Sequence, residues 1–370
     1  MKKAIMFPGK YMQGEHILNE IGSVVANYKK SHVFLIWGGS AKTLTCAEVL
    51  SSLENAGIKV SEEIFAGEIT RAKADVMTKA CIANGCDIVV GVGGGKIQDI
   101  AKAVAAAAEL RVVLCPTVSA SDASTGGCTV WYKEDGSGDG VGRWPNNPDA
   151  IIVDTAVCVK APVRMFRAGV ADALATYIEA DACNDTHAKA NSGGAPTLTA
   201  LALGKLCYDT LLKYAPAAEL AVEAKLSTPI YERVIEATTL MSGIGWESGG
   251  VCTAHVLGNF LGAFPETHGF MHGEKVAFGI AVQLMLDPDL DVDFINEVYD
   301  FMIRMKLPVT MSDVKMQDVS RERIYALAVE RCNAKIMLER HNFKVEPEAL
   351  CNAFFMAKAY GKKRRELLGL

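Results

Sequence analysis

The sequence lacks the features that mark nucleic-acid-binding and membrane-spanning proteins. It has no basic excess, because 38 Lys and Arg stand against 43 Asp and Glu and leave a net charge of −5. Neutralising a phosphate backbone requires clustered positive charge, so we expect no nucleic-acid partner. The longest apolar stretches, such as 87–95 and 101–108, are interrupted by glycine or charge and are too short to span a bilayer. We therefore expect no membrane insertion.

Signals of secretion and of a disulfide framework are missing as well. Met1, Lys2 and Lys3 are followed by a mixed segment with Pro8 and Gly9, where a signal peptide would have an apolar region. The 11 cysteines are scattered singly, and no CxxC pair occurs. This distribution is typical of reduced, mostly buried thiols. We expect a cytoplasmic protein.

Histidine is scarce too, with seven residues in the chain. Three of the seven, His255, His268 and His272, nevertheless lie close together in the sequence. Histidine is both a frequent metal ligand and a frequent acid–base group, so this clustering predicts a functional site.

What the sequence does contain is enough apolar material for two domains: 370 residues, 50% of them hydrophobic. Over the first 160 or so residues, short β-branched runs alternate with helical stretches, a pattern that predicts an open parallel α/β sheet. A strand entering a glycine-rich hairpin is predicted over 128–140. The expected strands are 33–37, 87–92, 112–115 and 151–153, and the expected helices are 41–56, 70–84 and 98–110.

From Pro162 onward the strand signal disappears and helical segments follow one another. We therefore predict an α/β, Rossmann-like nucleotide-binding domain over 1–161 and an all-helical domain over 162–370, with a ligand site in the cleft between them. The expected helices are 162–183, 198–214, 229–243, 253–263, 273–285, 292–305, 321–331 and 346–360.

The strongest local motif is the segment 91–99, with the sequence GVGGGKIQD. A buried strand leads into consecutive glycines and a helix begins directly after them, which is the arrangement that binds phosphate groups at a helix N-terminus. It is not a Walker A motif, because Ile97 follows Lys96, and it departs from the Rossmann fingerprint, because Lys96 stands where the third glycine belongs. The motif predicts a pyrophosphate site, with a purely structural turn as the alternative.

Asp172, His255 and His272 are candidate metal ligands. Asp172 lies in an apolar helical segment, where a buried carboxylate needs a charged partner. One Asp and two His form an oxygen and nitrogen set for a divalent cation and leave one position open for water or substrate. Spacing alone leaves open that these are ordinary core residues.

Together these segments resemble the glycerol dehydrogenase branch of the group III (iron/zinc) alcohol dehydrogenases, nearly end to end. The resemblance implies the dehydroquinate synthase-like architecture, a nicotinamide cofactor (NAD), a small polyol substrate and a homo-oligomer, typically an octamer. The matching segments are 8–14 (PGKYMQG), 91–99 (GVGGGKIQD), 116–122 (PTVSASD), 145–148 (PNNP), 171–176 (ADALAT), 247–250 (ESGG) and 272–279 (HGEKVAFG).

The resemblance also implies a role for each matching residue. Asp172, His255 and His272 take the zinc-ligand positions, and Asp122 takes that of the acid that contacts the polyol. Iron-dependent relatives carry a fourth ligand where this chain has Thr176, so zinc fits better. His268 is near the site without being a family ligand. The positions that line the dinucleotide are Gly93, Gly94, Gly95, Lys96, Asp99, Thr117, Ser119 and Tyr132.

The chain departs from the branch in two places. Gly39 stands where an Asp usually accepts a hydrogen bond from the adenosine ribose. Loss of that carboxylate predicts relaxed selectivity, with Ser40 and Lys42 able to receive the phosphate of NADP, unless a neighbouring residue replaces the contact. Small residues at 122–128 and at Gly258 predict a reshaped substrate pocket.

Two other functions stay open from the residues. A dehydroquinate-synthase-like lyase would also use NAD and zinc, but it needs additional basic residues for a phosphorylated substrate. Near the predicted ligands the sequence offers mainly Lys275 and Arg164. The other alternative, a non-catalytic nucleotide-binding module, is disfavoured by the intact Asp172, His255 and His272 set.

Overall fold

A parallel sheet organises the N-terminal part of the protein. The computed structural model describes residues 1–334 and 338–370, and within them six strands pair in the order β1-β8-β5-β4-β2-β3, all in parallel. The expected α/β sheet is confirmed. The strands are β1 (Tyr11–Gly14), β2 (His32–Gly38), β3 (Lys59–Phe65), β4 (Ile88–Gly93), β5 (Arg111–Pro116) and β8 (Ala150–Asp154).

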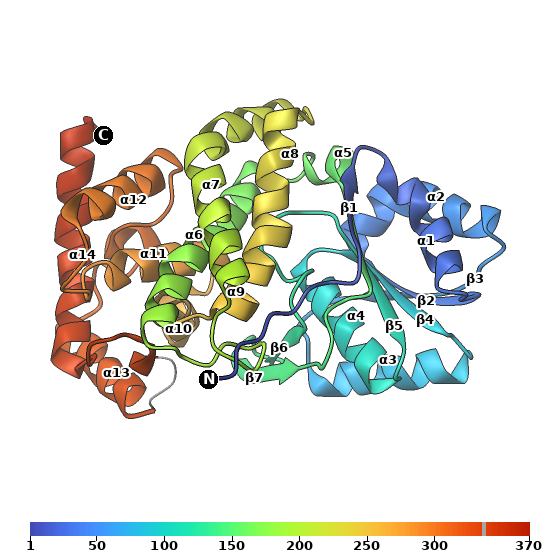
Figure 1. Ribbon diagram of the computed structural model, residues 1–370, viewed down its shortest axis with the longest axis horizontal. Coiled ribbons are helices and arrows are strands. Elements are labelled where there is room, and N and C mark those ends of the chain that lie inside the picture. The colour runs from blue at the N-terminus through green and yellow to red at the C-terminus, as the bar shows by residue number, and fades with distance from the viewer. Residues whose placement is uncertain (335–337) are drawn as a thin grey trace. The chain divides into compact units, whose positions relative to one another are not determined.

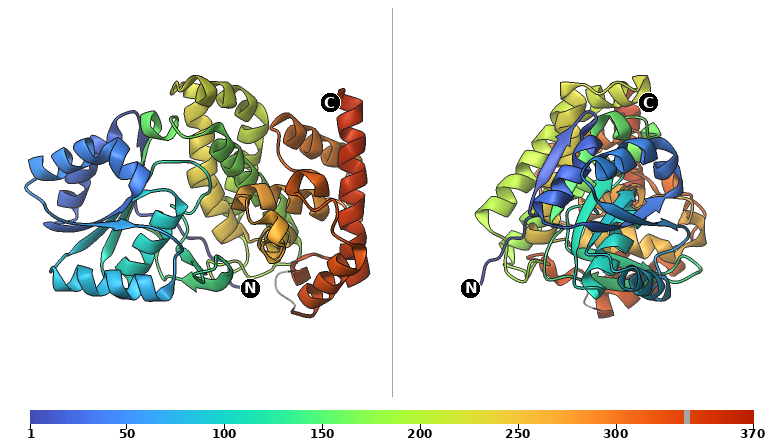
Figure 2. Two further views of the ribbon diagram at one scale, coloured as in Figure 1. Left: turned by 180° about the vertical axis from the view of Figure 1, so that it is seen from behind. Right: turned by 90° about the vertical axis from the view of Figure 1, so that its right-hand side faces the viewer.

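Both faces of this sheet are covered by helices (Figure 1). Alternate residues of a strand point to opposite faces, and the two core clusters follow this rule. Val33, Leu35 and Trp37 of β2 pack with α1 (Ile21–Asn27) and α2 (Gly39–Asn55). Phe34 and Ile36 pack with α3 (Arg71–Ala83) and α4 (Gly95–Ala107). Figure 2 shows the two helix layers, blue and cyan, on either side of the strands. Burial on both faces explains why the central strands read as continuous apolar runs.

The predicted hairpin is present as β6 (Cys128–Tyr132) and β7 (Gly138–Arg143), which pair antiparallel. The two edge strands of the sheet, β1 and β3, were not predicted from the sequence. Residues of β1 are only partly buried, and most residues of β3 are exposed or partly buried, so neither shows a clear apolar pattern.

The rest of the chain is helical, as expected. Its helices are α5 (Thr155–Cys158), α6 (Val163–Asp185), α7 (Leu198–Ala224), α8 (Pro229–Glu236), α9 (Ser242–Gly249), α10 (Thr253–Phe260), α11 (His272–Gln283), α12 (Val292–Arg304), α13 (Arg321–Ala334) and α14 (Pro347–Leu368). Helix α7 continues through Pro216 beyond its predicted end, because Ala215, Ala218 and Val222 remain buried on one face. The predicted helix 229–243 is interrupted by a π-helical turn, Ala237–Met241.

The chain divides into two compact units. One contains residues 1–5, 167–216 and 244–370, and the other contains residues 6–166 and 217–243. The segment 217–243 therefore belongs with the sheet. Gln13 of β1 donates a hydrogen bond to the Glu232 carbonyl at 2.9 Å, and the Tyr11 hydroxyl lies 2.9 Å from Thr239 Oγ1. Among the described residues, no helix combines the length and the apolar character that a membrane span requires.

Candidate metal and substrate site

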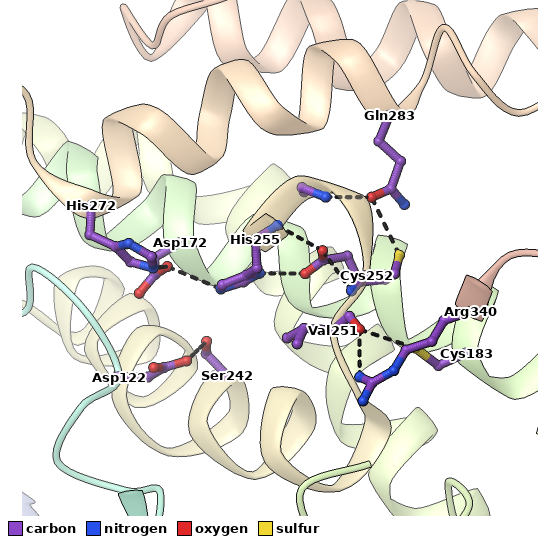
Figure 3. A network of polar contacts seen from close by, with 12 residues as sticks. Asp122, Asp172, Cys183, Ser242, Val251, Cys252, His255, His272, Gln283 and Arg340 are labelled. Carbon is purple, nitrogen blue, oxygen red and sulfur yellow. Dashed lines mark hydrogen bonds and ion pairs between the residues drawn. The ribbon is translucent and has the colours of Figure 1, made fainter. Parts of the chain in front are cut away.

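Three helices of the helical unit bring the predicted metal ligands together. Asp172 is on α6, His255 on α10 and His272 at the start of α11, and one ligand atom from each lies within 4.8 Å of the others. The Asp172 Oδ1 atom is 3.5 Å from His255 Nε2 and 3.4 Å from His272 Nε2 (Figure 3). Asp172 is buried, whereas 41% of the His272 side chain is exposed. The ligand set therefore has an inner side closed by protein and an outer side open to solvent.

Glycines allow these helices to approach each other closely. A Cβ atom on Gly273 would lie 1.9 Å from the Ala168 carbonyl oxygen of α6, and one on Gly279 would lie 2.3 Å from the Ala254 carbonyl oxygen of α10. Contacts this short do not occur in folded proteins, so both positions require glycine. The ligands thus converge because α11 packs directly on the backbone of its two neighbours.

Gly258 belongs to the same helix contact. A Cβ atom here would lie 2.8 Å from Val276 Cγ2 and 3.4 Å from Val276 Cα, so the position faces α11 at close range. The reshaped substrate pocket expected from this glycine stays a prediction. Thr176, which occupies the place of a fourth ligand, is fully buried, and a Cβ on Gly245 would lie 2.4 Å from its methyl group. Both positions are used for helix packing.

Glu179 is the residue of this site that sequence reasoning missed. Its side chain is completely buried, and its Oε1 atom accepts hydrogen bonds from the backbone amides of Cys252 and His255, both at 2.9 Å. Its Oε2 atom pairs with His255 Nδ1. A carboxylate only accepts, so Nδ1 is the donor and Nε2 is left facing Asp172. The signal in the sequence is the seven-residue spacing from Asp172, about two helical turns on one face of α6.

The charges around His255 favour a cation at this place. Burial alone would lower the pKa of His255, but the nearby Glu179 and Asp172 carboxylates outweigh it and raise this pKa well above its ordinary value. In zinc sites, a metal-binding histidine usually donates its other ring N–H to a group such as a carboxylate. One carboxylate, two imidazoles and this supporting carboxylate therefore fit a divalent transition metal.

His268 does not join the ligands. Its Nε2 lies 3.0 Å from the Gly262 carbonyl oxygen, its surface is exposed, and it is absent from the ligand group found among the described residues.

The predicted phosphate-binding turn lies where β4 passes into α4. Gly94 is the N-cap residue of α4, so the amides of the first helical turn point out of the strand end. Gly93 must be glycine, because a Cβ atom would lie 2.5 Å from Ile97 Cγ1. Its carbonyl accepts hydrogen bonds from Gln98 Nε2 at 2.7 Å and from the Thr117 amide at 3.1 Å. The turn is thus held from both sides and sits between the ends of β2 and β5.

The other residues expected at the dinucleotide are placed around this turn. Lys96 is half exposed and pairs with Glu68 at 2.6 Å. Thr117 and Ser119 are buried just after β5. Burial raises the pKa of the Tyr132 hydroxyl to about 12, with help from the charges of Asp99 and Glu68. Tyr132 is therefore protonated at neutral pH.

Asp99 faces inward. Its Oδ1 is 2.9 Å from the ammonium of the buried Lys102, and its Oδ2 accepts from the Val130 amide at 2.9 Å. Lys102 also donates to the carbonyls of Ala123 and Gly126, at 2.6 and 3.1 Å. This buried pair joins helix α4 to strand β6 and to the loop that follows Asp122.

Asp122, the predicted substrate acid, is itself held in place. It is 9% exposed, and the Ser242 hydroxyl donates a 2.5 Å hydrogen bond to its Oδ2 atom (Figure 3). Nearby, the Thr125 hydroxyl donates to the Thr239 carbonyl at 2.7 Å. Sequence reasoning missed Ser242, whose partner is 120 residues away, and Lys102, whose carbonyl partners are 21 and 24 residues away.

Gly39, which is expected to stand in place of a ribose-binding acid, is the first residue of α2, and Ser40 follows it on the surface. Lys42 is engaged: its ammonium lies 2.8 Å from the Glu62 carboxylate, which also accepts from the Trp37 indole at 2.8 Å. The hydrogen bond from Lys42 holds the pKa of Glu62 below its ordinary value. An acid of β3 therefore holds the lysine in the first turn of α2.

Comparison with known proteins supports the resemblance. The sequence profile of iron-containing alcohol dehydrogenases matches residues 8–155. Over 363 residues the chain is 37% identical to a glycerol dehydrogenase of Citrobacter freundii, covering 98% of this chain and 99% of that protein. It is 34% identical to a glycolaldehyde reductase of Halobacterium salinarum, covering 99% and 100%. The crystal structure of a glycerol dehydrogenase from Schizosaccharomyces pombe superposes with a TM-score of 0.95 at 31% identity, covering 100% of this chain and 93% of that one.

These matches define an oxidoreductase: the chain belongs to the iron-containing alcohol dehydrogenase family. Within that family, the relatives of similar length that it resembles most consistently are glycerol dehydrogenases. The expected fold, an α/β sheet part followed by a helical part, is confirmed as well.

Proposed function

We propose that this protein is a zinc-dependent dehydrogenase that transfers hydride between a small polyol or vicinal diol and a nicotinamide cofactor. The observation that carries the proposal is the convergence of Asp172, His255 and His272 on one point, with Glu179 behind His255. The full-length similarity to glycerol dehydrogenases supports the polyol as substrate class.

Asp172, His255 and His272 would hold the metal, and three protein ligands leave a position for the substrate, as in catalytic zinc sites. A bound zinc ion supplies Lewis acidity, which lowers the pKa of the alcohol to be oxidised. Zinc is favoured over iron because Thr176 offers no imidazole at the fourth family position. The exposed side of His272 leaves the substrate a route to the ligands.

Asp122 would orient a neighbouring hydroxyl of the polyol and pass the released proton outward. Its short hydrogen bond from Ser242 fixes the carboxylate in one orientation, which lowers the entropic cost of aligning the substrate. The proposed role of Asp122 thus combines positioning of the substrate with proton transfer.

The nicotinamide cofactor would bind with its pyrophosphate at Gly93, Gly94 and Gly95, where the free amides of α4 favour negative charge. When bound, it carries the hydride. The other residues proposed to line it are Lys96, Asp99, Thr117, Ser119 and Tyr132. Asp99 would act from beneath the turn, through Lys102 and β6.

We infer relaxed selectivity between NAD and NADP. Gly39 brings no carboxylate to repel a 2′-phosphate, and Ser40 and Lys42 are close by in α2. Because Lys42 is paired with Glu62, a 2′-phosphate must compete for its ammonium. We therefore expect both cofactors to be used, with NAD preferred. A preference of several hundred-fold for NAD in kcat/KM would contradict relaxed selectivity.

Assembly into a homo-oligomer, an octamer in the resembled branch, and a cytoplasmic location are part of the same proposal. Light scattering on the purified protein tests the assembly, and the location is tested by fractionation of the source cells.

One assay tests the function. Absorbance of the reduced cofactor is followed against a panel of diols and polyols, with and without a chelator. We expect turnover that the chelator removes and added zinc restores. Release of phosphate from a heptulosonate phosphate would identify a synthase-like lyase, and cofactor binding without turnover would identify a non-catalytic module.

A further inference from the structure

Helix α10, which carries His255, does not cap its own N-terminus. The side chain of its N-cap residue, Cys252, makes no capping hydrogen bond. Its first amides are instead bonded by side chains from two other helices. Glu179 of α6 accepts from the amides of Cys252 and His255, and Gln283 of α11 accepts from the Ala254 amide at 2.8 Å (Figure 3). The start of α10 is thus built from outside the helix.

The same two helices supply the other two metal ligands. Helix α6 carries Asp172 and Glu179, and helix α11 carries His272 and Gln283. Each therefore contributes one ligand and one side chain that fixes the segment bearing the third ligand. Of the two fixing residues, Glu179 alone also contacts the imidazole of His255.

We propose that Glu179 is the positioning residue of the metal centre, which sets the tautomer and the direction of His255. The inference rests on the proposed metal-dependent function. One carboxylate oxygen fixes the backbone at the start of α10, and the other fixes the ring through Nδ1. Together they leave Nε2 as the only ring nitrogen directed at Asp172 and His272.

The carboxylate is essential to this arrangement because all its partners are donors. Glu179 receives two backbone N–H groups on one oxygen and a ring N–H on the other. A glutamine has one acceptor and one donor end. If the NH₂ group of the glutamine faces the backbone, it meets the two backbone N–H groups, so that donors face donors. If the NH₂ group faces the ring, Nδ1 must accept its hydrogen bond. The ring proton then lies on Nε2, where the metal must bind.

The complete burial of the Glu179 carboxylate is hard to explain without such a positioning role. Glu179 is inaccessible to solvent, and a buried carboxylate is retained only where its lone pairs are satisfied. The N-terminus of a helix and a basic imidazole provide this, since both favour negative charge. If the residue served only as a cap, an uncharged side chain would suffice, as Gln283 shows at the same helix end.

The test uses the full-length protein, stripped of metal and reloaded with Zn²⁺ or Co²⁺. The variants are Glu179→Gln and Glu179→Asp, with Gln283→Met as the matched control that removes a cap from α10 without touching the imidazole. Zn²⁺ affinity is measured by competition with a chromophoric chelator, the ligand geometry from the visible spectrum of bound Co²⁺, and folding from the melting temperature of the metal-free protein.

We expect Glu179→Gln to weaken Zn²⁺ binding by about 10–100-fold, the usual effect of losing a supporting contact to a metal ligand. It should also change the Co²⁺ spectrum. Glu179→Asp keeps the charge but is one methylene shorter and should fall between Gln and wild type, so it reports even if the Gln variant fails to fold. Gln283→Met should lower the melting temperature and leave Zn²⁺ affinity within about threefold of wild type.

Two results would overturn the positioning role alone: Zn²⁺ affinity and Co²⁺ spectra of both Glu179 variants equal to wild type, or an equal loss of affinity in Gln283→Met, which would mean that any weakening of the helix start suffices. Failure of the wild-type protein to bind either ion would overturn the proposed function itself, and this inference with it. The two failures are therefore distinguishable.

Discussion

Lys42 of α2 and Glu62 of β3 form an ion pair, with 2.8 Å between the ammonium nitrogen and a carboxylate oxygen. The pair joins the first turns of α2 to β3, and the Trp37 indole fixes the same carboxylate from β2. The ammonium that is proposed to receive a 2′-phosphate is thus already paired with a carboxylate.

This arrangement predicts that Glu62 influences the proposed choice between NAD and NADP. We expect Glu62→Gln to release Lys42 and remove a negative charge, so that kcat/KM for NADP rises several-fold relative to that for NAD. Lys42→Met should shift the ratio in the opposite direction. Initial rates with both cofactors measure the ratio. An unchanged ratio in both variants would show that the pair lies outside the cofactor site.

Removal of a metal ligand should abolish metal binding and turnover together. We expect Asp172→Asn and His255→Ala to contain no stoichiometric zinc and to show only background activity, since a catalytic metal needs its full protein ligand set. Elemental analysis and the cofactor absorbance assay measure the two properties. The exposed His268 is the matched control, and His268→Gln should retain both. Full turnover in a zinc-free variant would refute the metal mechanism.

Loss of the Ser242 hydroxyl should reduce catalysis without reducing metal content. A hydrogen bond to a charged group is worth about 1.5–3 kcal/mol, and about 1.4 kcal/mol corresponds to a factor of ten. We therefore expect Ser242→Ala to lower kcat/KM for the polyol at least about tenfold. In a double-mutant cycle with Asp122→Asn the two effects should not add, because the serine acts through the aspartate. Additive effects would separate the two residues.

The contact between α6 and α11 predicts a position that tolerates no side chain. Gly273→Ala would place a Cβ atom 1.9 Å from the Ala168 carbonyl oxygen. Overpacking of this kind costs about 1–3 kcal/mol or more. We expect a lower melting temperature and weaker Zn²⁺ binding, because His272 is the adjacent residue. A Cβ on Gly262 would meet nothing within 4 Å, so Gly262→Ala is the control and should leave both unchanged.

Sequence reasoning predicted the central strands, the glycine-rich turn and the helical part, because each leaves a strong local signal. Strand β4 is buried throughout and ends in glycines. Glycine is required there because a helix that begins a few residues later packs closely against the turn. The edge strand β3 carries Glu62 and Glu63 on its surface and leaves no such signal.

At the site, the metal ligands were predicted because histidine is rare in the chain and because the surrounding segments match a known family. Glu179 and Ser242 were missed because their partners lie 73 and 120 residues or more away in sequence. Lys102 pairs with the nearby Asp99, but its carbonyl partners lie 21 residues or more away. The pairing of Lys42 with Glu62 is also a tertiary contact, since it joins helix α2 to strand β3.

Helices α6 and α11 each carry one proposed metal ligand and one side chain that caps α10, and this has a thermodynamic consequence. An ion bound by Asp172, His255 and His272 ties three helices at one point, and two of them also hold the start of the third. Any ligand that binds only the folded chain stabilises it, by about 4 kcal/mol at a thousand times its dissociation constant. The supply of that ion should therefore govern how long this protein survives a protease, as well as how fast it turns over.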